Sequence, residues 1–109
     1  MNVASKELCK ELYELSGWGS KLAVADNTDY LWEDGELIHR ASQIKNLKGI
    51  VPAYDLGYMR KMVYEHTPSN MVDVVESNFS KALFLGEDAT AKFVIGLFKQ
   101  GILKPEERK

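Results

Sequence analysis

Three segments of the chain carry apolar residues at the spacing of an amphipathic helix. The apolar positions recur every three or four residues, and charged or polar residues fill the opposite side. This pattern predicts helices over residues 5–16, 55–66 and 88–100. The apolar stripes comprise Leu8, Leu12 and Leu15 in the first segment, Leu56, Met59, Met62 and Val63 in the second, and Phe93, Val94, Leu97 and Phe98 in the third.

Capping residues stand at the predicted ends of these helices. Ser5, Asp55 and Asp88 have side-chain oxygens that accept hydrogen bonds from the first backbone N–H groups of a helix. Gly101 follows the third segment, where glycine adopts the left-handed conformation of a Schellman ending and turns Ile102 back onto the helix. The sequence therefore predicts where each helix begins and where the last one ends.

Two short runs around an Asp-Gly pair predict a β-hairpin. Residues 30–32 and 37–39 are mostly aromatic or aliphatic, and Asp34-Gly35 lies between them, where glycine accepts the positive φ of a hairpin turn. Residues 50–54 are predicted to be extended, because Pro52 disfavours the helical conformation of the residue before it.

Residues 71–85 are open to two interpretations. As strands, residues 71–76 and 79–85 flank Ser77-Asn78, and the valines favour extended chain. As a helix, the segment gathers its apolar residues on one face, although valine and the Ser-Asn pair are poor helix formers. That face comprises Val72, Val75, Phe79, Ala82 and Leu83. The pattern alone leaves the two interpretations even.

Composition and charge narrow the class of protein. The chain has 109 residues, 45% hydrophobic and 28% charged, which predicts one globular domain over residues 1–109. Its formal net charge of -2 argues against strong nucleic-acid binding, which requires a basic excess. No apolar run approaches the length of a membrane-spanning helix, and no secretory signal opens the chain. We therefore expect a cytoplasmic protein that does not enter a membrane.

Three segments of the chain, and the order in which they occur, resemble those of a known group of proteins. They are SKELCKEL (residues 5–12), VPAYDLGYMRKM (51–62) and GEDATAKFVIGLFKQGIL (86–103). Together they resemble small uncharacterised proteins carried by bacteriophages, prophages and conjugative elements of gut bacteria. In that group a β-hairpin precedes the last helix, so the resemblance implies strands in residues 71–85. Residues 67–85 depart from the pattern of the group, because this segment is short and lacks aromatic-rich strands. No activity, cofactor or catalytic residue comes with the resemblance.

The expected fold is α+β, with three helices packed on a small antiparallel sheet in the order αββαββα. A mostly α fold is the alternative, if residues 71–85 form a helix. The predicted core consists of Leu8, Leu12, Leu56, Met59, Phe93 and Leu97.

The candidate reactive residues do not form a recognisable site. Cys9 lies on the apolar side of the first predicted helix, so we expect a buried structural cysteine. His39 and His66 lack further ligands at zinc spacing. The acidic residues of 26–36 do not follow the EF-hand pattern, and residues 17–21 are too short for a phosphate-binding loop. We therefore expect no enzyme activity, no cofactor and no bound metal.

Aromatic and basic residues remain as candidates for function. Trp18 in a glycine turn and Tyr58 beside Arg60 and Lys61 are hard to bury, and Trp, Tyr and Arg dominate protein–protein hot spots. These four residues predict the partner-binding surface of a small adaptor protein that acts on a host or phage macromolecule. The alternative is a small-molecule binding protein or small hydrolase. Its pocket would lie near Tyr54, Asp55, His39 and Arg40.

A homodimer is a further expectation. If residues 22–25 form an open edge strand, a second copy can pair with it across a two-fold axis and cover Trp18. A charge at Val24 would then convert the dimer into a monomer.

Overall fold

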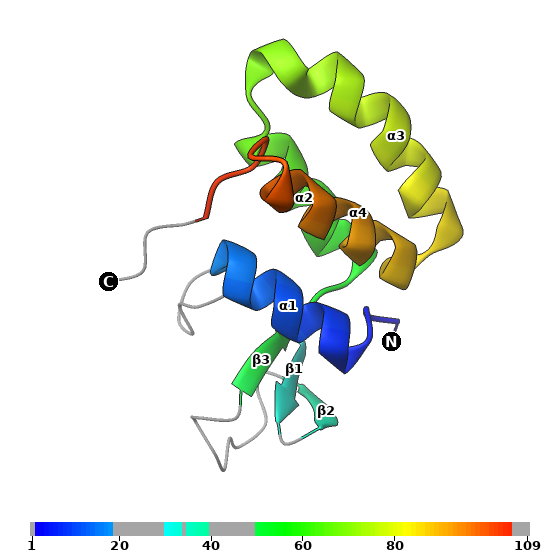
Figure 1. Ribbon diagram of the computed structural model, residues 1–109. Helices are drawn as coiled ribbons and strands as arrows, with labels where there is room; N and C mark the ends of the chain where they lie inside the picture. Colours follow the sequence, from blue (N-terminus) through cyan, green and yellow to red (C-terminus); the bar gives the residue numbers. More distant parts are fainter. Residues whose placement is uncertain (1, 19–29, 34, 40–49, 106–109) are drawn as a thin grey trace.

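The computed structural model describes residues 2–18, 30–33, 35–39 and 50–105. Within these ranges the fold is α+β and mostly helical (63%), with four α-helices and a three-stranded antiparallel sheet (Figure 1). The elements follow the order αβββααα. They are α1 (Lys6–Ser16), β1 (Tyr30–Glu33), β2 (Glu36–His39), β3 (Ile50–Ala53), α2 (Leu56–His66), the short 3-10 turn η2 (Ser69–Met71), α3 (Val72–Leu85) and α4 (Glu87–Lys99).

The sheet is built around β1, which pairs with β2 on one side and β3 on the other. Leu31 of β1 lies opposite Ile38 of β2 and opposite Pro52 of β3. The β1–β2 pair confirms the predicted hairpin, and Gly35 between the strands has a φ of 86°. Among the described strands, β3 with Pro52 lies at an edge of the sheet, the position where a residue without an N–H disturbs the hydrogen bonding least.

The first two helices begin where the sequence predicts. The N–H of Leu8 donates to Oγ of Ser5 at the start of α1 (3.4 Å), and the N–H of Tyr58 donates to Oδ1 of Asp55 at the start of α2 (2.7 Å). Gly17 ends α1 with a φ of 74°. Both predicted N-caps are therefore confirmed.

The predicted Schellman ending is also confirmed at the end of α4. Gly101 has a φ of 79° and its N–H donates to the carbonyl of Phe98 (3.1 Å). The N–H of Ile102 donates to the carbonyl of Leu97 (3.0 Å). These are the two hydrogen bonds that define the motif.

The prediction that Asp88 caps the last helix is wrong. The helix begins at Glu87, and Gly86 takes the N-cap position with a φ of 112°. The carboxylate of Asp88 instead accepts a hydrogen bond from the backbone N–H of Ser5 (2.7 Å). The hydroxyl of Thr90 donates to the carbonyl of Gly86 (2.8 Å), which fixes the turn before the helix. Asp88 therefore joins the start of α4 to the start of α1.

The prediction of strands in residues 71–85 is wrong, and with it the order αββαββα. The segment forms η2 and the helix α3, because Val75, Phe79 and Ala82 recur at helical spacing and are buried. Phe79 stacks on Phe93 of α4, with ring centroids 5.8 Å apart. Burial against α4 thus outweighs the β-propensity of the valines.

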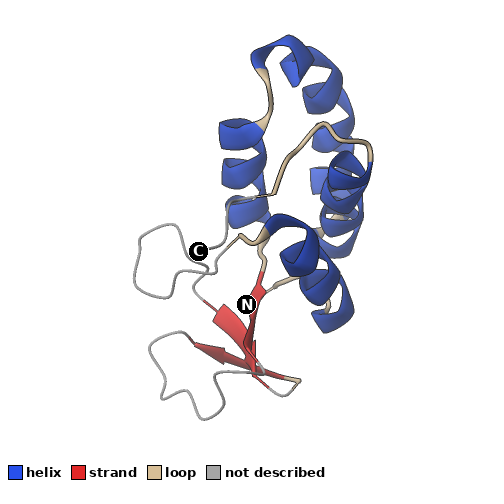
Figure 2. Ribbon diagram, turned by 60° about the vertical axis from the view of Figure 1, so that its left-hand side comes forward, coloured by secondary structure: helices blue, strands red, loops and turns tan. Residues whose placement is uncertain are grey.

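The core lies between α4 and the elements around it. α4 packs against α1, α2 and α3, and α1 also packs against β3. The helices gather at one end of the described structure and the sheet lies at the other (Figure 2). Leu12, Met59 and Leu97 are buried as predicted. The other predicted core residues are partly buried and pack against this cluster. They are Leu8, Leu56 and Phe93.

Among the helices of the described ranges, none is long and apolar enough to cross a membrane.

Candidate functional site

Trp18 was expected at the surface and is fully buried. Its ring lies between His66 (centroids 5.7 Å apart) and Phe98 (5.1 Å), and its carbonyl accepts a hydrogen bond from the hydroxyl of Tyr54 (2.7 Å). The left-handed conformation of Gly17 turns the chain back at the end of α1 and places the indole in the core. The expectation that Trp18 is exposed is therefore wrong.

Tyr58 is also buried, with 9% of its surface exposed, and stacks on Tyr54. Arg60 and Lys61 are exposed on α2 as expected. The guanidinium of Arg60 lies 5.7 Å from the ring centroid of Tyr64, which is 42% exposed. The exposed aromatic residue beside the basic pair is therefore Tyr64, not Tyr58 or Trp18.

The described residues of the alternative pocket make contacts within the fold. The hydroxyl of Tyr54 is engaged with Trp18, and burial raises its pKa well above the ordinary value. The carboxylate of Asp55 caps α2, and His39 contacts the ring of Tyr30 edge-on (5.1 Å). Arg40 lies outside the described residues, as does the segment 22–25 of the expected dimer.

Cys9 lies fully buried between the N-terminal segment and the end of β3. Its thiol donates to the carbonyl of Ala4 (3.4 Å), and Sγ accepts from the N–H of Tyr54 (3.4 Å). Burial raises the pKa of the thiol. This arrangement agrees with the expected structural cysteine. Within the described ranges, no three histidine, cysteine or acidic residues are grouped to hold a metal ion.

The strongest candidate surface lies on α3, the most peripheral helix (Figure 1). Phe84 is 91% exposed, Leu85 74% and Val74 58%. Ser77 and Lys81 are also exposed and lie between them on the same side of the helix. We call these five residues the α3 outer face. Soluble proteins rarely gather large exposed apolar side chains without a binding role.

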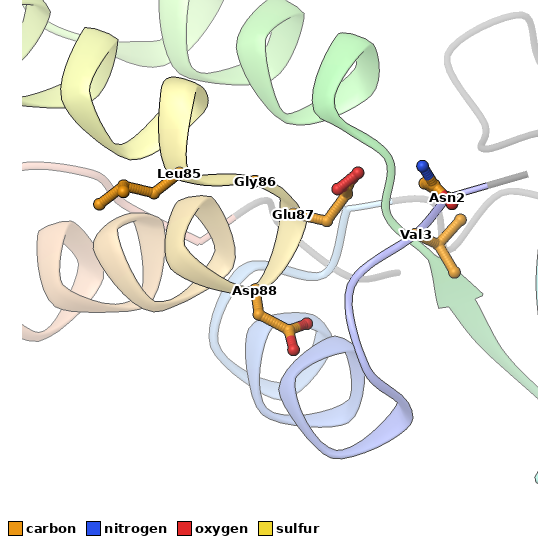
Figure 3. Close-up of a pocket in the computed structure, with 6 residues that line it drawn as sticks. All are labelled: Asn2, Val3, Leu85, Gly86, Glu87 and Asp88. Carbon is orange, nitrogen blue, oxygen red and sulfur yellow. The ribbon is translucent and has the colours of Figure 1, made fainter.

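Two shallow pockets meet at Leu85. One, of about 430 Å³, is lined by Ser80, Lys81, Phe84 and Leu85 and is almost wholly apolar. The other, of about 320 Å³, lies at the corner between α3 and α4 and is mostly polar. Figure 3 shows Glu87 of this second pocket turned toward Asn2 and Val3, while Leu85 points away from them. The apolar side of the corner therefore belongs to the α3 outer face.

The sequence of α3 itself contains a signal for this surface. When residues 72–85 are placed on a helix, apolar side chains fall on two opposite sides. Val75, Phe79 and Ala82 face α4, whereas Val74, Phe84 and Leu85 face outward. A helix that is apolar on both sides normally has partners on both sides.

The described residues thus define a small α+β domain with an apolar surface on its outermost helix. Comparison with protein-family models, with curated proteins and with solved structures finds no match for this chain.

Proposed function

We propose that this protein is a non-enzymatic binding or adaptor protein that acts through a protein–protein interface. In line with the resemblance to phage and mobile-element proteins, its partner is a host or phage macromolecule. The proposal places the interface on the α3 outer face, with Arg60, Lys61 and Tyr64 of α2 as a second exposed group.

One observation carries this proposal, the exposure of Phe84 and Leu85 at the end of α3. Burying these two side chains against a partner would remove a large apolar area from water, and apolar burial is the main favourable term in protein association. The polar groups of Tyr54, Asp55 and Cys9 form hydrogen bonds with other groups of the fold. This supports a binding function rather than a catalytic one.

Affinity capture with matched variants tests the proposal. The bait is the wild-type protein, the double variant Phe84→Glu/Leu85→Glu, or the control Gln100→Glu, which adds a charge at an exposed position near the end of α4. We expect a bacterial lysate to yield a protein that wild type and control retain and the double variant loses. If all three baits capture the same proteins at micromolar concentration, the α3 outer face is not the interface.

A further inference from the structure

The helix α3 packs on the rest of the described structure mainly through one side. Its extensive contacts are with α4 and with the adjoining turn η2, and it lies at the outside of the helices (Figure 1). Three of its 14 residues are buried, namely Val75, Phe79 and Ala82, whereas α4 buries six of 13. Tyr64 of α2 adds an edge-on contact to the ring of Phe79 (6.1 Å). α3 therefore contributes less to the shared core than α4 does.

The sequence of α3 does not stabilise a helix by itself. Its three valines and the Ser77-Asn78 pair are poor helix formers, and no side chain of the described residues caps its first turn. A helix of 14 residues is marginal in water even when its sequence favours the helix. α3 therefore stays helical because it packs against α4, and its backbone N–H groups become open to exchange whenever it leaves α4.

The two connections of α3 have the properties of hinges. Gly86 alone joins α3 to α4, and its φ of 112° and ψ of −173° are backbone angles that essentially only glycine adopts. A Cβ at Gly86 would meet no atom within 4 Å, so side-chain packing does not hold this turn. At the other end of α3, Pro68, Ser69 and Asn70 are exposed. A few residues at the ends of an element are sufficient to absorb the change of backbone angles when the element moves.

A buried hydroxyl joins the end of α3 to the start of α4. Thr90 of α4 is fully buried, and its Oγ1 donates to the carbonyl of Ala82 (3.0 Å) as well as to that of Gly86 (2.8 Å). Ala82 is one of the last four residues of α3, whose carbonyls have no partner within the helix. The contact between Thr90 and Ala82 therefore exists only while α3 is closed on α4.

We propose that α3 opens away from α4 as one unit, with hinges at Gly86 and at residues 68–71, and that the hydroxyl of Thr90 holds it closed. The open form is a sparsely populated state of the native protein, so equilibrium unfolding remains a single transition. Opening uncovers Phe79 and Phe93, which stack in the closed form. The inference goes beyond the proposed function, because it concerns the inner side of α3 and needs no partner.

Native-state hydrogen exchange, measured by NMR at increasing urea concentration, tests the opening. We expect the amides of residues 76–85 to converge on one free energy of opening, with protection at least about tenfold lower than that of the most protected amides of α4. This opening should depend less steeply on urea than global unfolding, because it exposes less surface. Protection that falls gradually toward the helix ends would indicate fraying, and an α3 that exchanges together with α4 opens only on global unfolding. Either result would overturn the proposal.

Substitutions at Thr90 test its role in the closed form. Thr90→Val keeps the shape of the side chain and removes the hydroxyl, so the protection of the α3 amides should fall about fivefold, the effect of one hydrogen bond. Thr90→Ser keeps the hydroxyl and should keep most of this protection. Unchanged protection of α3 in Thr90→Val would show that the hydroxyl does not hold the helix closed.

Tyr54→Phe is the matched control, because its hydrogen bond to Trp18 lies outside α3 and stays formed in the open state. It should lower the protection of the most protected amides and leave that of α3 unchanged. An equal fall in both would show that α3 exchanges only through global unfolding.

Gly86→Ala tests the hinge independently. A side chain at a φ of 112° strains the closed turn and the strain is relieved on opening, so the protection of α3 should fall by about fivefold or more. Unchanged protection would overturn the hinge at Gly86. All these measurements use the protein alone, so a failure of this inference is distinguishable from a failure to capture a partner.

Discussion

Cys9 illustrates how the fold controls a single reactive group. The thiol is fully buried and burial raises its pKa, so the folded protein presents neither an accessible sulfur nor a thiolate. We expect a thiol-specific disulfide reagent to react with the folded protein at least about a hundredfold more slowly than with the urea-unfolded protein, since reaction requires an opening of the fold. Cys9→Ala provides the blank. Equal rates in both states would show that the thiol is accessible.

Tyr54 connects β3 to the loop after α1 through its hydroxyl. Tyr54→Phe removes the hydrogen bond to the carbonyl of Trp18 and leaves that carbonyl without its donor. We expect the free energy of unfolding to fall by about 1–2 kcal/mol, measured by urea denaturation. Tyr64→Phe is the matched control, because this exposed tyrosine should change stability by less than about 0.5 kcal/mol. A loss of the same size in both variants would argue against the role of this hydrogen bond.

The same tyrosine makes stability depend on pH in the alkaline range. Burial raises the pKa of Tyr54 well above its ordinary value of 10.0, so the unfolded chain releases the phenol proton at a lower pH than the folded chain does. The stability that Tyr54 contributes is fully present below the pKa that its phenol has in the unfolded chain. This stability is lost as the pH rises through the pKa of the phenol in the folded chain, because the unfolded state then binds fewer protons than the folded state. We expect wild type to lose more stability than Tyr54→Phe between about pH 8 and about pH 11 in urea titrations. If the stabilities of wild type and Tyr54→Phe fell by the same amount over this pH range, the prediction would be wrong.

The presence of residue types that favour interfaces was not enough to locate the exposed candidate surface. Trp18 and Tyr58 belong to the residue types that dominate interfaces, but these types also fill cores, and only tertiary packing decides between the two. The turn at Gly17 buries Trp18, while Tyr58 falls on the buried side of α2. Arg60 and Lys61 are exposed because they follow the polar side of the same helix.

Among the elements, α4 offers a paired test of glycine conformation. Gly101 has a φ of 79°, which a side chain disfavours even though a Cβ there would meet no atom within 4 Å. Gly96 lies inside the helix, and its Cβ would approach only Nε2 of Gln100, at 3.9 Å. We expect Gly101→Ala to lower the free energy of unfolding by about 1 kcal/mol and Gly96→Ala to raise it by about 0.5–1 kcal/mol. Thermal or urea unfolding followed by circular dichroism measures both; changes of the same sign would refute the conformational argument.

The helices show which elements a single sequence can predict. The spans 5–16, 55–66 and 88–100 agree with α1, α2 and α4 to within one residue, because apolar stripes and capping groups are local signals. The secondary structure of residues 71–85 could not be predicted from the segment alone, because its sequence is compatible with both a helix and two strands. The helix is favoured only when α4 provides a surface against which Val75 and Phe79 are buried. The side chains of Asn78 and Ser80 donate to carbonyls four positions earlier, which accommodates them within the helix.

At the scale of the whole molecule, α4 holds the other helices together. Leu97 is 4% exposed in the shared core, so Leu97→Ala should lower the free energy of unfolding by about 2–5 kcal/mol. Because α1, α2 and α3 all pack against α4, circular dichroism and tryptophan fluorescence should report the same shifted transition. Two separate transitions would show that the helices unfold independently of one another.

The hydrogen bond between Ser5 and Asp88 has a consequence for how the chain folds. It joins residues 83 positions apart, and the salt bridge between Glu11 and Lys99 (3.2 Å) joins the same two helices. Contacts of such long sequence separation close large loops, which slows folding relative to proteins whose contacts are local. During synthesis, α1, the sheet, α2 and α3 all leave the ribosome before α4 does. We therefore expect the sides of these elements that pack on α4 to stay exposed until α4 emerges, and the shared core to close only then.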